Sequence, residues 1–510
     1  MNFAESLTIQ SLRWPDKIAI KTESRNTTYK VLNSNVNSLS HGLHSLGIKK
    51  GDMICQLQGN TIEHFELLYA IGKIGAIRIP LDPRGNLVEW KNILENFKPS
   101  ALVYDNAFAS SVRQLQADLG QHMHYIEVSR NPSKNAISYE DLTANFSKEE
   151  PEAEVCGKDP YIIQSTSGSM GIPKAVLLTH EATILRVLMR AVDLGNHLNG
   201  VYLAVTSLAN TASTFFGLSQ LFLGGTVILR DKFDPHKFLK TIEEEKVTNS
   251  SLVPVMGERL LEVKEITRYD LSSLQFLLVY GAPLHKKTRE SLIRFVTPKI
   301  VETYGITETG PITNLMPHDQ LKKMDSVGQP TTLTKIKIMD DRGEILSPGE
   351  VGEILVKTPY LFKEYLNNPK KTKQNFRNGW FHTGDLGKLD EDGYLYVIGR
   401  RANMTISGGY NIYEEEVEQV IAEHPKVKEV AVIGVPDETW GEAVKAVVVL
   451  KPNTQATEEE IKEFCKQKLP SYKKPRSVDF SAGLPRFSSG KLAKQKLRDK
   501  YWKGLKKKVS

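Results

Sequence analysis

The hydrophobic pattern alternates short apolar runs with stretches of helical spacing over most of the chain. Runs such as Met53–Leu57 and Phe276–Tyr280 predict strands, and Glu63–Ile74, Ala182–Val192 and Pro235–Glu245 have the spacing of helices. Strands that alternate with helices indicate layered α/β structure with largely parallel sheets. Further strands are predicted at Ile18–Lys21, Ala76–Pro80, Tyr161–Ile163, Ala175–Leu178, Val201–Val205, Thr226–Arg230, Ser251–Val253 and Lys299–Glu302.

The pattern changes twice towards the C-terminus. From about residue 334, three strands separated by turn-rich segments predict a small antiparallel β unit, at Lys335–Met339, Gly352–Val356 and Tyr394–Ile398. After Arg401, a helix at Tyr413–Glu423, strands at Val427–Val435 and Ala443–Leu450, and a capping box of Thr457 and Glu460 indicate a separate α+β domain. We therefore expect an α/β fold with two parts: a large N-terminal domain, 1–399, of layered α/β subdomains plus the small β unit, and a small mobile C-terminal α+β domain, 400–510.

One long segment, from Leu194 to Leu229, contains no Asp, Glu, Lys or Arg. A membrane span is disfavoured because asparagines, threonines and serines interrupt the apolar residues and Gly224-Gly225 closes the run. We interpret it as a buried core segment that lines a cavity with small polar groups. The N-terminus shows no signal-peptide pattern.

Composition narrows the function classes further. The chain has 510 residues, and 67 basic against 60 acidic residues give a net charge of +7. Three scattered cysteines have no metal-ligand spacing, so a reducing cytoplasm is expected and a disulfide scaffold is not. Basic residues gather in the last twenty positions; a solvated tail is favoured there over nucleic-acid or lipid binding, because no aromatic interleaving accompanies the charge.

The strongest local signal is the loop from Gln164 to Lys174, which reads Gln-Ser-Thr-Ser-Gly-Ser-Met-Gly-Ile-Pro-Lys between two predicted strands. Small hydroxylated residues and glycines let backbone N–H groups converge on an anion, and a lysine adds a point charge for phosphate. The loop is not a Walker A motif, since Pro173 precedes the lysine and Ala175 follows it. The candidate phosphate ligands are Ser165, Thr166, Ser167, Gly168, Ser169, Gly171 and Lys174; a plain flexible turn is the alternative.

Four further segments follow in order: Tyr304-Gly-Ile-Thr-Glu308, Gly379-Trp-Phe-His-Thr-Gly-Asp385, Gly399-Arg-Arg401 and Leu484-Pro-Arg-Phe-Ser-Ser-Gly-Lys491. Together with the loop at 164–174, they resemble the adenylate-forming superfamily over essentially the whole chain. This family includes acyl-CoA synthetases, adenylation domains and firefly luciferase. Membership implies that ATP and a carboxylic acid form an acyl-adenylate and pyrophosphate, with Mg²⁺, before the acyl group passes to a thiol.

The resemblance implies a role for each matching position. Residues 165–174 would hold the β- and γ-phosphates, Tyr304 would pack on adenine, and Thr307 and Glu308 would meet the α-phosphate and the magnesium ion. The segment Gly281-Ala282-Pro283 would lie beside adenine. Asp385 would accept from the ribose hydroxyls, Arg400 would lie near ribose and phosphate, and Lys491 would be the mobile catalytic lysine. Gly408 and Gly409 match the loop that approaches the pantetheine thiol.

Some positions depart from the family pattern. Met170 and Ala175 stand where Thr and Gly are usual, the stretch Ala402-Asn403 lacks the usual hinge acid, and residues 206–211 lack the aromatic or histidine gate. His382 is interpreted as structural rather than as a catalytic base, and His180 as a helix cap or packing residue. The acyl pocket is predicted to involve Asn210, Thr211, Ser213, Phe215, Tyr280, Gly305 and Thr309.

The resemblance leaves three possible functions for this chain within the family. The favoured one is an acyl-CoA ligase, using ATP, Mg²⁺ and coenzyme A, which looks closest to the crotonobetaine/carnitine or medium-chain branch. The second is a stand-alone adenylation enzyme that loads an acyl or aryl acid onto a carrier-protein thiol, and the third is a non-catalytic or luciferase-like relative. The segment Phe216-Gly-Leu-Ser219 lacks the acid that would hold an α-amino group, and the pocket residues include no cation for a second carboxylate. A monocarboxylic acid is therefore expected, with no nucleic-acid partner; a homodimer is left open.

Overall fold

The computed structural model describes residues 1–120, 122–166, 174–486 and 492–502. The chain divides into two compact units. The large unit holds residues from the N-terminus to Lys335 together with Lys357–Gln374, and the small unit holds Ile336–Val356 and the chain from Asn375 onward. The expected domain boundary between residues 399 and 400 stays a prediction.

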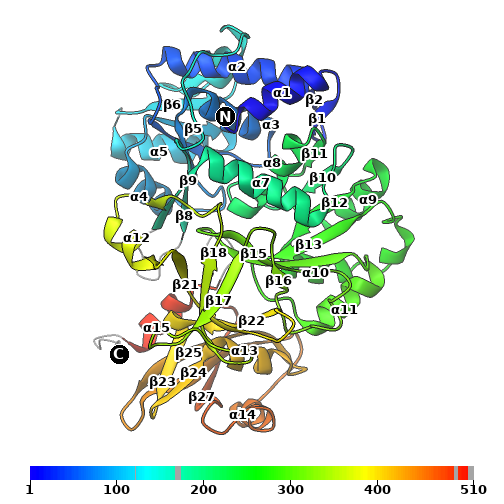
Figure 1. Cartoon of the computed structure of the whole chain (residues 1–510), viewed down its shortest axis with the longest axis vertical. Helices are drawn as coiled ribbons and strands as arrows, with labels where there is room; N and C mark the ends of the chain where they lie inside the picture. The colour runs from blue at the N-terminus through cyan, green and yellow to red at the C-terminus, as the bar shows by residue number, and fades with distance from the viewer. Residues whose placement is uncertain (121, 167–173, 487–491, 503–510) are drawn as a thin grey trace. The chain divides into compact units, whose positions relative to one another are not determined.

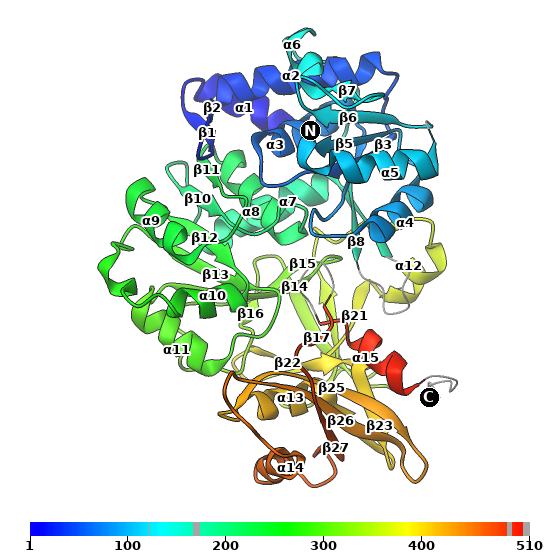
Figure 2. The same cartoon turned by 180° about the vertical axis from the view of Figure 1, so that it is seen from behind.

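The first sheet of the large unit has nine strands in the order β16-β15-β14-β13-β12-β10-β11-β1-β2 (Figures 1 and 2). Its central pairs are parallel, and the registers Leu277↔Ile300 and Tyr280↔Thr303 bring the ends of β13 and β14 together. The strands are β1 (Ile18–Lys21), β2 (Asn26–Thr28), β10 (Val201–Ala204), β11 (Thr226–Leu229), β12 (Asn249–Leu252), β13 (Phe276–Tyr280), β14 (Ile300–Ile306), β15 (Gly310–Leu315) and β16 (Gln329–Pro330).

Helices bury both faces of this sheet. The core on one face joins Leu203, Leu277 and Val279 of the strands to apolar side chains of α9 (Pro235–Glu245), α10 (Pro254–Leu261) and α11 (Lys286–Phe295). Helix α8 (Thr211–Phe222) packs on β10 and β11, and α7 (His180–Leu194) packs on α8. Burial of these apolar surfaces is the main force that holds the layers together.

The second sheet of the large unit has eight strands in the order β19-β9-β8-β4-β3-β5-β6-β7. Strand β19 pairs with β9 (Glu364↔Leu177), which places Tyr365 beside the strand that leaves the phosphate loop. The elements are β3 (Met53–Leu57), β4 (Ile77–Pro80), β5 (Ala101–Asp105), β6 (His124–Val128), β7 (Ile137–Ser138), β8 (Pro160–Thr166), β9 (Lys174–Thr179) and β19 (Glu364–Tyr365), with helices α1 (Glu5–Arg13), α2 (Tyr29–Ser45), α3 (Ile62–Ile74), α4 (Leu87–Phe97), α5 (Ala109–Leu119), α6 (Tyr139–Ala144) and α12 (Pro369–Asn375).

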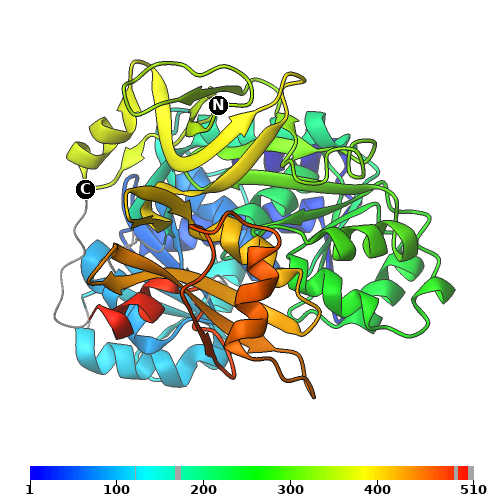
Figure 3. The same ribbon diagram turned by 90° about the horizontal axis from the view of Figure 1, so that it is seen from below.

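The small unit contains two five-stranded sheets. Its chain from Asn375 onward is drawn in yellow to red in Figure 3. In the second of them, α13 and α14 contribute Val417, Ile421, Ile461 and Cys465 to the core on one face, and α15 contributes Leu497 to the other. The elements are β17 (Lys335–Met339), β18 (Gly352–Lys357), β20 (Phe376–Arg377), β21 (Trp380–Leu389), β22 (Leu395–Arg400), β23 (Met404–Ser407), β24 (Tyr410–Tyr413), α13 (Glu414–Ala422), β25 (Val427–Asp437), β26 (Gly441–Leu450), α14 (Glu458–Lys466), β27 (Ser477–Phe480) and α15 (Lys494–Tyr501).

The α/β fold class is confirmed, and most elements lie where the pattern predicts them. The capping box forms: Thr457 Oγ1 accepts from the Glu460 N–H at 3.1 Å. The uncharged segment is mostly buried from Gly200 onward, with α8 almost wholly enclosed, whereas residues 194–199 are partly or fully exposed. No helix in the described part of the chain is long and apolar enough to cross a membrane.

Candidate active site

The arms of the phosphate loop form an antiparallel pair. Strand β8 enters the loop and β9 leaves it, with Thr166 opposite Lys174. The ammonium of Lys174 lies 5.7 Å from the centroid of the Tyr365 ring. Of the predicted phosphate ligands, Ser167, Gly168, Ser169 and Gly171 lie outside the described residues, as do the side chains of Ser165 and Thr166.

The motif at 304–308 forms the end of a hairpin. Strand β14 extends through Tyr304 to Ile306, further than predicted, and turns through Thr307 and Glu308 into β15. The Glu308 side chain is buried, and the Tyr365 hydroxyl donates to its Oε1 at 2.7 Å. Tyr365 thus lies against both Lys174 and Glu308, so the predicted phosphate cation and the predicted magnesium carboxylate share one neighbour.

A buried arginine on α7 fixes the backbone of this turn. Arg186 donates to the carbonyl oxygens of Thr307 (3.0 Å) and Glu308 (2.8 Å), and also to that of Tyr360 (3.0 Å). Burial lowers the pKa of Arg186 to about 9, which leaves it protonated at neutral pH. Gly310 lies beside it with φ of +71°, and a Cβ there would come 3.2 Å from Nε of Arg186. The turn therefore depends on a guanidinium and a glycine that fit together.

The predicted acyl-pocket residues gather around a chain of hydroxyl groups. Thr206 Oγ1 lies 2.7 Å from Ser213 Oγ, which lies 2.8 Å from the Tyr280 hydroxyl. Phe215 packs near Arg186, whose guanidinium carbon is 5.8 Å from the ring centroid. Asn210 caps α8 by accepting from the Ala212 N–H.

The other predicted residues of this region are held by local geometry. Thr309 is buried, and its Oγ1 donates to the Gly310 carbonyl at 2.9 Å. Gly305 has no room for a side chain, since a Cβ would come 2.3 Å from the Gly310 oxygen. Thr211 is the first residue of α8, and Gly281, with φ of +90°, opens the exposed turn that continues through Ala282 and Pro283.

The segment where the family places a gate is bound through its backbone. Asn60 donates to the Thr206 carbonyl at 3.1 Å and accepts from the Leu208 N–H at 3.0 Å. Gln164, at the start of the phosphate loop, donates to the Ala209 carbonyl at 3.1 Å. These bonds fix the backbone of the segment and connect it to strand β8.

In the small unit, Asp385 and Arg400 are opposite residues of neighbouring strands. Their register in β21 and β22 brings Nε of Arg400 within 3.0 Å of Oδ1 of Asp385. The aspartate side chain is 4% exposed, whereas the arginine side chain is 60% exposed. The two residues that the family resemblance assigns to ribose and phosphate thus form one ion pair.

Two histidines flank the motifs, and both pack inside the protein. His180 stacks on Tyr161 with ring centroids 4.3 Å apart and accepts from the Phe3 N–H through Nδ1. Burial lowers the pKa of His180 to about 4. His382 is buried with Nδ1 3.1 Å from Oε2 of Glu353. Packing is confirmed for His180, while Thr179 is the cap of α7.

The loop after the Gly399-Arg-Arg401 motif contains two glycines with positive φ, Gly408 at +57° and Gly409 at +83°. A Cβ on Gly408 would come 2.4 Å from the Trp440 ring, whereas one on Gly409 would meet no atom within 4 Å. Asn403, which stands where an acid is usual, donates to Oε1 of Glu415 at 2.7 Å. Lys491 lies outside the described residues.

Lys494 and Arg498 near the C-terminus are not solvated, which corrects the expectation of a solvated tail at these two positions; Lys496 and Lys500 of the same helix are exposed. Lys494 lies 2.8 Å from Oε1 of Glu418, and Arg498 lies 2.6 Å from Oε2 of Glu414. Arg498 also donates to Oδ1 of Asn403. The helical period places both cations on the face of α15 that packs against the small-unit core.

Within the described ranges, no cluster of three or more His, Cys, Asp or Glu could hold a metal ion. A magnesium ion bound with nucleotide needs only one or two carboxylates, because phosphate oxygens and water complete its shell. The buried carboxylate of Glu308 fits that requirement, and Lys174 would supply a cation for phosphate. The donor set is therefore compatible with magnesium and ATP.

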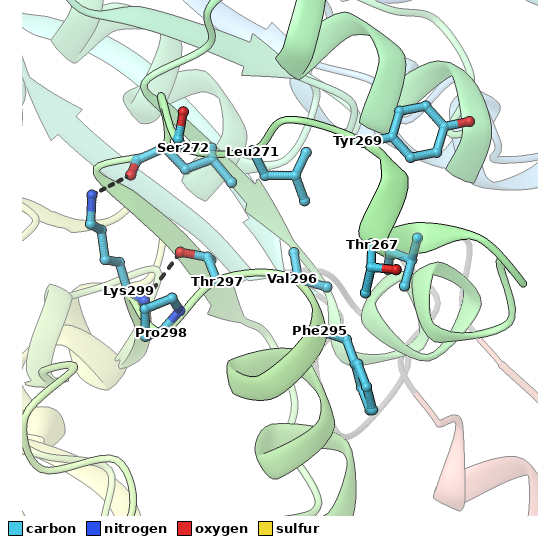
Figure 4. A pocket seen from close by; sticks show the side chains of 11 residues that line it. Thr267, Tyr269, Leu271, Ser272, Phe295, Val296, Thr297, Pro298 and Lys299 are labelled. Carbon is cyan, nitrogen blue, oxygen red and sulfur yellow. Dashed lines mark hydrogen bonds between the residues drawn. The ribbon is translucent and has the colours of Figure 1, made fainter.

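A separate hollow of about 310 Å³ lies between the segment 266–274 and the end of α11 (Figure 4). Its walls include Tyr269, Leu271, Phe295 and Lys299, whose ammonium donates to the Leu274 carbonyl. None of the predicted site residues that the structure describes lines this hollow. It is not part of the candidate active site.

Sequence reasoning missed Arg186 and Tyr365, which contact the predicted residues Thr307 and Glu308, and also Arg190 and Tyr360 beside them. Arg190 stacks on Phe216 with its guanidinium carbon 4.0 Å from the ring centroid. Two arginines four residues apart inside an otherwise apolar helix are the signal that was available, because charged residues are rarely buried without a role.

Comparison with known proteins identifies the family. The AMP-binding enzyme family matches residues 7–366, and the AMP-binding enzyme C-terminal domain matches residues 416–491. Long-chain-fatty-acid–CoA ligase FadD13 of Mycobacterium tuberculosis is 34% identical over 481 residues, which cover 93% of each chain. The 2-succinylbenzoate–CoA ligase of Bacillus licheniformis is 34% identical, covering 95% of this chain and 97% of that one.

The fold agrees with these relatives. The crystal structure of ATP-bound MatB from Rhodopseudomonas palustris matches with a TM-score of 0.89 and 29% identity, covering 98% of this chain and 99% of that one. The matched ranges contain the phosphate loop, the turn at Glu308 and the segment that ends at Lys491. The chain therefore belongs to the AMP-binding enzyme family, the adenylate-forming superfamily that its motifs resemble.

Proposed function

We propose that this protein is an ATP-dependent acyl-CoA ligase that activates a monocarboxylic acid as its acyl-adenylate and transfers the acyl group to coenzyme A. The observation that carries the proposal is the contact of Tyr365 with both Lys174 and Glu308. With the roles that the family resemblance gives to Lys174 and Glu308, this arrangement would bring a phosphate-binding cation close to a carboxylate suited to magnesium. The two matched CoA ligases support coenzyme A as the thiol.

The two half-reactions need only groups of the types found here. In the first, a carboxylate oxygen of the acid forms a bond to the α-phosphorus of ATP while the bond to pyrophosphate breaks. No general base is required, because the acid is already ionised at neutral pH. In the second, the thiol sulfur forms a bond to the acyl carbon, AMP leaves and the thiol proton is released. Lysine and magnesium stabilise the charge that develops during the first displacement.

We assign each part of ATP to the residues that match the family's motif for it. Tyr304, Thr307 and Gly281 to Pro283 would serve the adenine and α-phosphate, and Asp385 and Arg400 the ribose. Lys491 would be the catalytic lysine of the first half-reaction. Gly408 and Gly409 would border the path of the thiol in the second, because their positive φ and lack of side chains let a ligand approach the backbone closely.

A carrier-protein thiol is the second candidate acceptor. The sequence also offers Lys473, Lys474 and Arg476 as basic residues for the phosphates of coenzyme A. One observation keeps the carrier protein open: Lys473 forms a 2.7 Å ion pair with Glu416. Its charge is therefore already compensated. The cytoplasm remains our proposed location, supported by three cysteines that are all free of disulfides.

Separate assays of the two half-reactions test the proposal. Lys491→Ala should lower the rate of acyl-adenylate formation by about 100-fold or more, because it removes a charge that stabilises the transition state. Thioester formation from pre-made acyl-adenylate should change little. Gly409→Leu should do the reverse, since a side chain at this positive φ is strained and would obstruct the thiol. Equal losses in both half-reactions for Lys491→Ala would rule out this division of roles.

A further inference from the structure

Helix α7 carries a second buried arginine one turn after Arg186, and its environment differs. Arg190 is 8% exposed. Its guanidinium lies over one face of Phe216 at 4.0 Å from the ring centroid. Its Nε is buried without a hydrogen-bond partner, and none of the described residues forms a hydrogen bond or an ion pair with the side chain.

The groups that surround Arg190 leave its charge uncompensated. Tyr202 of β10, Tyr280 of β13 and Tyr360 supply hydroxyl groups nearby, Phe216 supplies an aromatic face, and the neighbouring charge is another cation, Arg186. Burial lowers the pKa of Arg190 to about 10, so the side chain remains a cation at neutral pH. A buried charge without a partner is unfavourable, and proteins retain one mainly where it binds something.

The position of Arg190 connects it to the predicted acyl pocket. The ring of Phe216, on which it stacks, lies 5.9 Å from the ring of Tyr280. The hydroxyl of Tyr280 in turn contacts Ser213, which lies on α8 together with Phe215 and Phe216. The unpartnered guanidinium thus borders the side chains to which the sequence assigned the acyl group.

We propose that Arg190 binds a planar oxygen acceptor, a carboxylate or a carbonyl, on the acyl group at a distance from the carboxyl that is activated. The inference rests on the proposed function, because only an acid-activating enzyme holds an acyl group there. A guanidinium presents a fixed fork of donors that matches such oxygens, whereas an alkyl chain would leave those donors unsatisfied. The inference replaces the expected plain monocarboxylic acid with an acid that carries a second oxygen group, either a carbonyl or a second carboxylate.

The test compares alkanoic, oxo-alkanoic and alkanedioic acids of matched chain length by pyrophosphate release. The wild-type protein should prefer one of the oxygenated acids over the plain acid. Arg190→Leu should lower kcat/KM for that acid by about 10- to 100-fold, the range for losing a hydrogen bond to a charged group. The same variant should leave kcat/KM for the plain acid within a few-fold. The oxo and dicarboxylic acids distinguish a neutral acceptor from a charged one.

Two further variants make the result decisive. Arg190→Lys keeps the charge without the planar fork and should retain part of the preference for the oxygenated acid. It also provides the test if the Arg190→Leu variant does not fold. Arg294→Leu is the matched control, since this exposed arginine also lies over an aromatic ring, 5.1 Å from the centroid of Phe295, on α11. It should change neither activity.

Three results would overturn the inference. The wild-type protein could prefer the plain acid, or Arg190→Leu could lower activity equally for all acids, as a purely structural cation–aromatic contact would. In both cases pyrophosphate release by the wild-type protein would leave the proposed function standing. Absence of pyrophosphate release with every acid would instead reject the proposed function and the inference with it.

Discussion

Two pairs of buried cations, one in each unit, have opposite surroundings. In the large unit, Arg186 donates to three backbone carbonyls and Arg190 stacks on an aromatic ring. In the small unit, Lys494 and Arg498 form ion pairs with Glu414, Glu415 and Glu418. The first pair keeps a net positive charge inside the protein, and the second pair is neutralised by acids.

The difference separates a binding role from a structural one. Arg186 uses its donors on the carbonyls of the turn at Glu308, whereas Arg190 faces an aromatic ring and by our inference is left for an oxygen acceptor on the acyl group. The ion pairs of Lys494 and Arg498 with acids of α13 hold α15 against α13. The helix that follows Lys491 in sequence is therefore anchored within the small unit. Removal of a partner should therefore affect stability in the small unit and substrate activation in the large one.

The largest effect is expected for Glu414→Ala in the small unit. Its carboxylate is fully buried, and the substitution leaves Arg498 buried without its counter-charge. Breaking one side of such a pair typically costs about 3–5 kcal/mol of stability. Denaturant unfolding of the full-length protein, followed by a fluorescence probe in the small unit, measures the change.

A matched acid on the surface provides the control. Glu463 pairs with Lys466 at 3.2 Å, but both side chains are more than half exposed. Glu463→Ala should cost at most about 1 kcal/mol, because solvent screens exposed pairs. If the two variants were equally stable, the charge network around α15 would not be what anchors the helix.

A buried acid that forms no ion pair with any described residue gives the second prediction. Glu66 on α3 accepts hydrogen bonds from two neutral groups, Asn35 at 2.8 Å and Tyr139 at 3.0 Å. Burial, with the nearby charge of Glu63, raises its pKa from 4.5 to about 7. Between these values the folded protein binds more protons than the unfolded chain, so stability should fall as pH rises, by about 3 kcal/mol in all.

The pH dependence of unfolding between pH 4.5 and 7 tests this assignment. Glu66→Gln keeps an oxygen acceptor but cannot ionise. The free energy of unfolding of this variant should therefore fall less than that of the wild-type protein as pH rises. The difference between the two curves isolates Glu66 from the other titrating groups. Parallel curves for the two proteins would show that Glu66 does not carry the raised pKa.

The third prediction concerns Arg186. Arg186→Met keeps much of the apolar volume but releases the carbonyls of Thr307 and Glu308, so the turn should lose its fixed position. A misplaced reacting group can cost about 100-fold in rate. Pyrophosphate release should therefore fall by about this factor, while transfer from pre-made acyl-adenylate should change much less. Equal losses in both assays would indicate general damage to the fold.

The fold was predictable from the sequence because its elements follow simple periodicities. Met53–Leu57 and Phe276–Tyr280 are strands with the predicted bounds, and Pro235–Glu245 is a helix with the predicted bounds. Strands β15 and β16 were missed, since polar and proline residues interrupt their apolar pattern. The spacing of apolar residues indicates which face of a helix or strand is buried. It does not indicate which segments pair at the edge of a sheet.

The candidate site was predictable only where its residues form contiguous motifs. Tyr304, Glu308 and Asp385 each lie in a recognisable segment, whereas Arg186 and Tyr365 contact Glu308 from more than 50 residues away. The fold creates such long-range contacts, and no spacing in the sequence reports them. The same reason explains why the pocket was expected to lack a cation although α7 brings Arg190 to its border.

The central claim is that the protein activates acids as adenylates before thioester formation, and a product analysis tests it most directly. ATP labelled at the α-phosphate is incubated with magnesium and a panel of carboxylic acids, with and without coenzyme A. The account predicts labelled AMP and an equal amount of pyrophosphate, with an acyl-CoA thioester only when coenzyme A is present. Formation of ADP with an acyl phosphate, at any acid in the panel, would contradict it.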